Sequence, residues 1–128
     1  MSYYFDKMLE MDFDAAVSRV KEQLKEEGFG VLTEIDVKET MRQKLGKEFR
    51  NYRILGACNP PFAYDALLAE DKIGTMLPCN VIVQEISNSK VEVAAVDPVS
   101  SMQAINNPNL GAVASAIRAK LKNVVDRL

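Results

Sequence analysis

A pair of adjacent strand-forming segments in the second half of the chain constrains its fold most strongly. Residues 77–86 and 91–96 are rich in Val and Ile, and Ser87-Asn88-Ser89-Lys90 between them is typical of a turn. Two strands joined by so short a connection pair antiparallel, because a parallel pair needs a much longer crossover. The hairpin therefore indicates an α+β fold rather than a doubly wound parallel sheet.

Hydrophobic periodicity and turn residues predict the other elements. Further strands are expected at 2–10, 31–37 and 52–59, and helices between Asp12 and Gly28, between Asp36 and Gly46, after Pro60-Pro61 and after Asn107-Pro108. A length of 128 residues is typical of one domain, so residues 1–128 are expected to form a single domain. The predicted architecture is a mixed or antiparallel sheet with helices packed on one face, in the order β-α-β-α-β-α-β-β-α.

The expected helix ends carry capping residues. The predicted N-caps are Asp12, Asp36 and Asn107. Gly28 is expected just past the end of the first helix, where Phe29 would pack back onto Leu24 in a Schellman arrangement. These residues set the predicted helix boundaries.

The predicted strand at 77–86 is apolar on both of its faces. Val81 and Val83 alternate with Ile82 and, further along, Ile86. This pattern is typical of a strand that is covered on both sides. Because the helices are expected on one face of the sheet, a second copy of the chain is expected on the other, and a two-fold homodimer is the commonest such arrangement.

Composition excludes several classes of function. Histidine is absent, which excludes Ser-His and Cys-His catalytic pairs within one chain and histidine-containing metal sites. The net charge of −2 gives no electrostatic basis for binding nucleic acid. No apolar stretch is long enough to span a membrane, the first residues lack a secretion signal, and two cysteines are too few for a disulfide framework. A cytoplasmic protein with reduced thiols is expected, with neither nucleic acid nor membrane as a partner.

Both cysteines are followed by asparagine and lie near a proline at a predicted strand end, in GACNP (56–60) and LPCNV (77–81). If the two strands belong to one sheet, Cys58 and Cys79 lie close together as a dithiol, a soft-metal site or a reactive thiol with its partner. The alternative is that both are small core side chains. Asn59 and Asn80 either donate to an oxyanion or bond to local backbone.

Glu34 and Asp36 lie two residues apart in one predicted strand, so their side chains share a face, opposite to Val31, Thr33 and Ile35. Two carboxylates at this spacing suit a metal or a substrate proton. Asp36 has a structural explanation as a helix N-cap. Glu34 has none, and is either a partly buried acid with a raised pKa or a solvated residue at the sheet edge.

Three long segments of the chain are distinctive: GFGVLTEIDV (28–37), ILGACNPPFAYDAL (54–67) and IGTMLPCNVIV (73–83). They resemble the family known as domain of unknown function 302, and the likeness runs essentially from end to end. The resemblance implies a small bacterial or archaeal protein with a mixed α+β fold and dimeric assembly, but no agreed activity and no settled catalytic residue. The positions that match the family's recurrent pattern are Glu34, Asp36, Cys58, Pro61, Pro78 and Cys79.

Two hypotheses about function follow. In the first, a homodimer binds a small ligand or a soft metal such as zinc or copper in a pocket lined by Glu34, Cys58 and Cys79, with Asn59 and Asn80 as polar supports and the two cysteines as metal ligands. In the second, the chain is a non-catalytic structural or protein-interaction dimer with buried cysteines. A thiol oxidoreductase fits less well because the Cys-x-x-Cys spacing is missing. The sequence names no cofactor and leaves open whether the protein is an enzyme.

Overall fold

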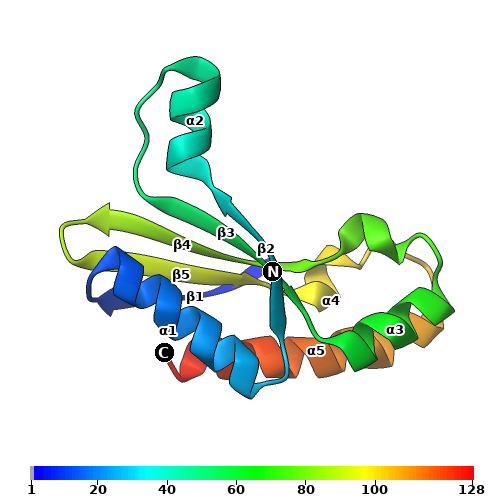
Figure 1. Cartoon of the computed structure of the whole chain (residues 1–128). Helices are drawn as coiled ribbons and strands as arrows, with labels where there is room; N and C mark the ends of the chain where they lie inside the picture. Colours follow the sequence, from blue (N-terminus) through cyan, green and yellow to red (C-terminus); the bar gives the residue numbers. More distant parts are fainter. Residues whose placement is uncertain (1) are drawn as a thin grey trace.

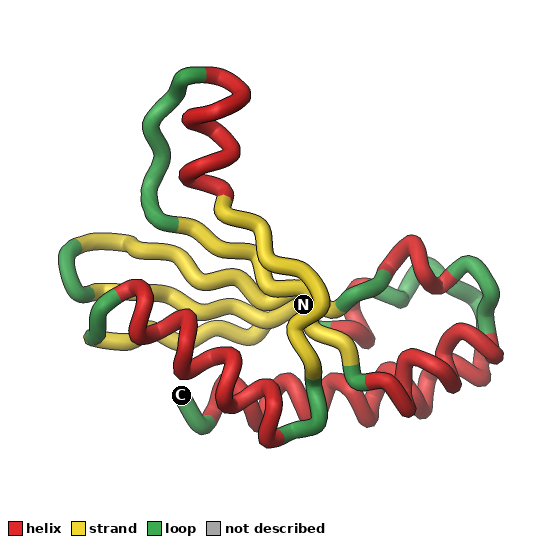
Figure 2. Tube along the Cα trace, in the orientation of Figure 1, coloured by secondary structure: helices red, strands yellow, loops and turns green. Residues whose placement is uncertain are grey.

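A five-stranded antiparallel sheet organises the fold (Figures 1 and 2). The computed structural model describes residues 2–128. The strands are β1 (Tyr4–Glu10), β2 (Gly30–Asp36), β3 (Tyr52–Cys58), β4 (Cys79–Ser87) and β5 (Lys90–Val96), in the order β1-β5-β4-β3-β2 across the sheet. The expected hairpin is formed by β4 and β5, and all neighbouring strands run antiparallel. The predicted α+β class is confirmed.

The helices gather mainly on one side of this sheet. They are α1 (Phe13–Glu26), α2 (Val37–Leu45), α3 (Pro60–Ala69), α4 (Pro98–Ser101) and α5 (Pro108–Asp126), with a 3-10 helix, η1 (Ile73–Met76). Figure 1 shows α1 and α5 beneath the sheet, α3 running beside α5 past the sheet end, and α2 standing away from the body. The predicted order is confirmed, with η1 and α4 added. Both additions are four residues long, too short to produce a periodic pattern.

Alternation along the central strands builds the core. Val83 of β4 lies directly opposite Val93 of β5, and both are fully buried under the helices. The apolar faces of α1 and α5 pack against these strand side chains, and Leu24 of α1 and Leu121 of α5 are also fully buried. Each such side chain contributes roughly 1.5–3 kcal/mol of burial free energy, so this packing holds the helices to the sheet.

The helix ends form as their sequence predicts. The predicted N-caps, whose side chains accept hydrogen bonds from the first helical turn, are Asp12, Asp36 and Asn107. At the end of α1, the N–H of Phe29 donates to the Leu24 carbonyl at 2.9 Å and that of Gly28 to Lys25 at 3.0 Å, which is the Schellman pattern. Gly28 has a φ of 86°, a conformation that favours glycine.

A bulge in β2 changes which of its side chains are buried. Val31 pairs with Ala57 and Thr33 with Gly56, which are consecutive in β3, so Leu32 is an extra residue. Val31 therefore faces the helices with Ala57, whereas Thr33 faces the other side of the sheet. The prediction that Val31 and Thr33 share a face is wrong, because a bulge interrupts the simple alternation of a strand.

Gly56 of β3 lets Thr33 of β2 and Pro78, the residue before β4, approach its backbone closely. A Cβ atom at this position would lie 2.1 Å from Thr33 Oγ1 and 2.7 Å from Pro78 Cγ. Both distances are well below van der Waals contact, so any larger residue would push β2 or the start of β4 away from β3.

We therefore expect Gly56→Ala to lower the free energy of unfolding by roughly 1–3 kcal/mol, the usual range for overpacking. Gly111→Ala is the matched control, because a Cβ there meets no atom within 4 Å and the residue lies in α5. In a helix this change raises stability by about 0.5–1 kcal/mol. Urea denaturation measures both, and a neutral Gly56→Ala would contradict the close approach.

Candidate functional site

A cavity of about 300 Å³ lies where α3 and α5 extend past the ends of β3 and β4. Its walls are almost entirely apolar: Phe62 and Leu67 come from α3, and Leu110 and Ile117 from α5. Pro78, the residue before β4, also lines it. Throughout residues 2–128, no charged side chain lines this cavity.

Cys58 and Cys79 both line this cavity, at the end of β3 and the start of β4. The antiparallel register places Cys79 opposite Ala57, next to Cys58 in the chain. Cys79 is buried and Cys58 half-buried, and both are free thiols. Burial, together with the neighbouring Cys58, raises the pKa of the Cys79 thiol to about 11. Cys79 is therefore an uncharged wall of the cavity at neutral pH.

Asn59 also lines the cavity, as the N-cap residue of α3. Its side-chain Nδ2 donates to the backbone carbonyl of Glu27 at 3.1 Å. That carbonyl belongs to the C-cap residue of α1, where helical carbonyls lack intrahelical partners. The bond joins the end of α1 to the start of α3 and fixes the Asn59 side chain against the cavity.

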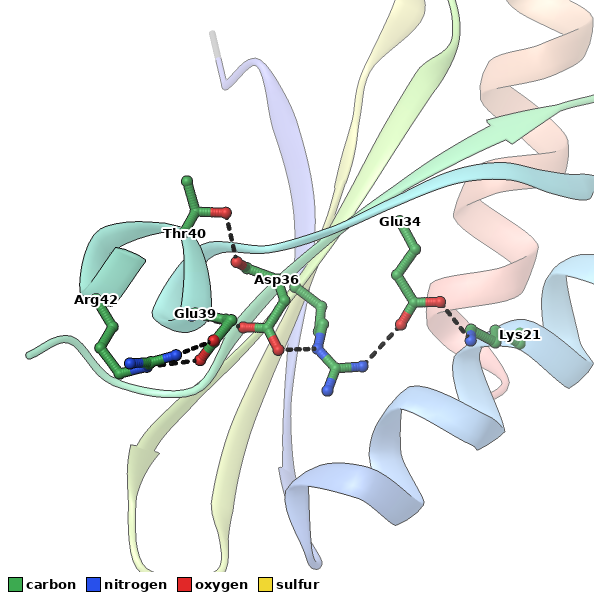
Figure 3. Close-up of polar contacts among 7 residues, drawn as sticks. Lys21, Glu34, Asp36, Glu39, Thr40 and Arg42 are labelled. Atoms are coloured by element: carbon green, nitrogen blue, oxygen red, sulfur yellow. Dashed lines mark hydrogen bonds and ion pairs between the residues drawn. The ribbon is translucent and has the colours of Figure 1, made fainter. Parts of the chain in front are cut away.

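Glu34 lies outside the cavity, on the face of the sheet that packs against α1. Figure 3 shows its carboxylate turned toward Lys21 of α1, and the two side chains are 2.7 Å apart. Arg53 Nη1 lies 2.7 Å from the other carboxylate oxygen. The hydrogen bond from Lys21 lowers the pKa of Glu34; burial opposes this, and the hydrogen bond from Arg53 adds to the lowering. A raised pKa, one of the two alternatives that the sequence left open, is therefore wrong.

Asp36 has the structural role that its position predicts. Its carboxylate accepts a hydrogen bond from the N–H of Glu39 at 3.0 Å, and it lies 3.6 Å from Arg53 Nε. Asp36 and Glu34 thus both form ion pairs with Arg53, because their side chains lie on the same face of β2. Neither contributes to the cavity that contains the cysteines.

Asn80 lies on the opposite side of the sheet from Cys79, because consecutive strand residues alternate. It lines a separate, more polar hollow of about 440 Å³ together with Tyr52, Gln84 and Glu92. The two Cys-Asn pairs therefore differ. Cys58 ends β3 and Asn59 follows it, and both residues line the cavity. Cys79 and Asn80 both belong to β4, so their side chains lie on opposite faces of the sheet.

The structure thus brings together Cys58, Asn59 and Cys79, and separates them from Glu34 and Asn80. In the part of the chain that is described, no three Cys, Asp or Glu side chains are grouped to hold a metal. The apolar walls from α3 and α5 were not foreseen as a site, since their periodic stripes are typical of ordinary core helices. No helix between residues 2 and 128 is both long and apolar enough to cross a membrane.

The fold and this cavity define a class: a small α+β domain with an apolar hollow beyond the sheet end and a pair of free thiols in its wall. The family model called "Domain of unknown function DUF302" matches residues 5–128, and the chain belongs to this family. The expected family membership is confirmed. No curated protein matches the chain.

A solved structure shares the architecture across nearly its whole length. It is described as the crystal structure of the uncharacterized conserved protein DUF302 from Bacillus stearothermophilus. The two chains are 29% identical and superpose with a TM-score of 0.90, over 99% of this chain and 98% of the other. The fold described above is therefore shared with this relative.

The two thiols are expected to react at very different rates. A thiol with a pKa of about 11 is ionised in only about one molecule in a thousand at pH 8, and the thiolate is the nucleophile. We expect iodoacetamide to label Cys58 in the folded protein at least about tenfold faster than Cys79. Mass spectrometry of the labelled peptides measures this, with Cys58→Ser and Cys79→Ser as controls. Equal rates would contradict the buried, uncharged state of Cys79.

Proposed function

We propose that this domain binds a small, predominantly apolar molecule in the cavity between α3, α5 and the strand ends. The observation that carries the proposal is the cavity itself. Protein cores are packed so closely that voids larger than a water molecule are few, whereas ligand pockets begin at roughly 300 Å³. The hollow is of this size and has apolar walls, as expected for a site that holds an apolar ligand.

The position of the cavity favours exchange of such a ligand with solvent. Leu32, which the β2 bulge leaves 68% exposed, and the exposed Leu67 of α3 both line the cavity. The cavity is therefore bordered in part by solvent-exposed aliphatic side chains. Cys58 and Cys79 supply soft, polarizable surface, and their free state agrees with the reducing cytoplasm, the location that we propose.

A direct test uses 4-propyltoluene, an uncharged and fully apolar probe. We expect it to shift the methyl NMR signals of Leu110 and Ile117, and Ala63→Phe to weaken its binding at least about tenfold by filling the cavity. Ala112→Phe, the same change at an exposed position of α5 outside the cavity, should leave binding unchanged. Probe binding that survives Ala63→Phe would place the ligand elsewhere.

A soft metal such as zinc or copper is the other ligand that Cys58 and Cys79 suit. Two features make a metal a less favoured ligand than an apolar molecule. The described residues offer no third Cys, Asp or Glu beside the pair, whereas zinc sites usually have four ligands. Burial of Cys79 also opposes formation of the thiolate that binds metals. Stoichiometric zinc or copper in the purified protein would reverse this order.

We also propose that the chain forms a homodimer through the sheet face that α1 and α5 leave open. Met8 is 50% exposed on this face, and Tyr4 and Ile35 are exposed as well. Among residues 2–128, helices cover β4 on one face only, and Ile82 on the other face remains half-buried. The double cover that the sequence predicted for β4 therefore needs a second copy.

Charge and shape favour α2 of the second copy as the covering element. α2 has no buried residue in its own chain, although it carries an apolar stripe that ends at Leu45. Residues 36–50 contain five basic and three acidic side chains. The open faces of β1 and β5 carry three acids and one base: Asp6, Glu10, Glu92 and Lys90. A two-fold arrangement lets each α2 lie over the other copy's acidic strands.

Sedimentation equilibrium tests this assembly. We expect a dimer at tens of micromolar, and Met8→Lys should raise the dissociation constant at least about tenfold by placing a cation beneath a basic helix. Raised salt should also weaken the dimer, because screening reduces charge complementarity. Leu68→Lys, at an exposed position of α3, is the matched control. A wild-type monomer would contradict the proposal. The open face would then either bind a different protein or bind none.

A further inference from the structure

We infer that the cavity ligand is a neutral molecule with one hydrogen-bond donor, and that Asn59 Oδ1 accepts from this donor. The inference rests on the proposed binding of an apolar ligand and names its chemical class: an alcohol, a phenol or an amide N–H on a hydrocarbon body. Three features of the cavity lead to it.

The first feature is the lack of charge in the cavity wall. Within the described chain, none of the lining side chains is an acid, a lysine or an arginine. An ionised ligand buried there would lose its hydration without gaining a counter-charge, which strongly disfavours its binding. Carboxylates, phosphates and amines are therefore poor ligands, and a neutral molecule is favoured.

The second feature is the unused oxygen of Asn59. This residue is only 6% exposed and lines the cavity. Its Nδ2 donates to the Glu27 carbonyl, and since only the amide nitrogen can donate to a carbonyl, the side-chain orientation is fixed by chemistry. No group among residues 2–128 donates to Oδ1, and neither thiol does.

The third feature explains why this oxygen is free. An asparagine at an N-cap normally accepts from the N–H groups of the second or third helical residue, as Asn107 does from Asn109 at 3.0 Å. Asn59 makes no such bond. Pro60 and Pro61 occupy the first two positions of α3, and proline has no N–H, so one usual donor is missing. The sequence Asn-Pro-Pro thus leaves the side-chain oxygen of Asn59 without a bond to its own helix.

Asn59 Oδ1 is an acceptor that has no protein donor among residues 2–128, in a residue that lines the cavity. A ligand hydroxyl or N–H in the cavity supplies one to Asn59 Oδ1 without adding charge. The apolar body of the same ligand fills the space between α3 and α5. The site therefore distinguishes ligands by a single polar group, which an entirely apolar cavity cannot do.

The test compares 4-propylphenol with 4-propyltoluene, in which a methyl group replaces the hydroxyl. In Asn59→Ala we expect the affinity for 4-propylphenol to fall about tenfold relative to that for 4-propyltoluene, because the buried hydroxyl then lacks an acceptor. Asn80→Ala is the matched control: it changes the other Cys-Asn pair, whose asparagine lies across the sheet, and should leave the ratio unchanged. Calorimetry or NMR titration measures both affinities.

Loss of the Glu27 bond could unfold Asn59→Ala, so a second comparison uses the wild-type protein alone. We expect 4-propylphenol to bind at least about fivefold more tightly than 4-propylanisole, which lacks the donor, and 4-propylbenzoate not to bind detectably. If 4-propyltoluene binds and neither comparison shows a preference for the phenol, the inference is overturned while the proposed function stands. If none of the four probes binds, the proposed function itself fails.

Discussion

The arrangement of this molecule depends on how α5 packs, since that helix belongs to two apolar clusters at once. It has 19 residues and is therefore about 28 Å long. Its second half, including Leu121 and Val124, packs under the sheet in the main core, whereas Leu110 near its start joins a smaller cluster with Ala66 and Ile73. The helix extends past the sheet end (Figure 1), so α3 and η1 must cover its first turns. The cavity lies where the two clusters meet, bordered by Ile117 of one and Leu110 of the other.

Local signals in the sequence were sufficient for most of the secondary structure. The turn at 87–90, the N-caps and the Gly28 terminator all act over a few residues, and their interactions are the ones that these residue types prefer. The bulge at Leu32 could not be foreseen, because it depends on how β2 pairs with β3, two strands separated by α2. A bulge of one residue leaves no pattern in a seven-residue strand and reverses the faces of the residues before it.

The candidate site was predictable only in part, for a similar reason. Both Cys58 and Cys79 lie at predicted strand ends, so the sequence predicts their proximity on the condition that the two strands share a sheet, and β3 and β4 do pair. The partners of Glu34 come from α1 and β3, and no local pattern pairs Glu34 with Lys21 or Arg53. The walls of the cavity come from helices about 40 residues apart in the chain. Their apolar stripes were visible in the sequence, but a stripe shows only that a face is covered and not that the space beneath it is filled.

The cavity between the two clusters affects the cooperativity of the fold. A segment that shares few packed contacts with the main core can open without unfolding the rest. α3 and η1 belong mainly to the smaller cluster and border the cavity, and Phe62 of α3 packs against the main core. An occupant of that cavity would bridge the two clusters and make their unfolding one event. The rate of amide hydrogen exchange in α3 would then fall when a ligand occupies the cavity. Protection of α3 from exchange would therefore measure how much of the protein has ligand bound.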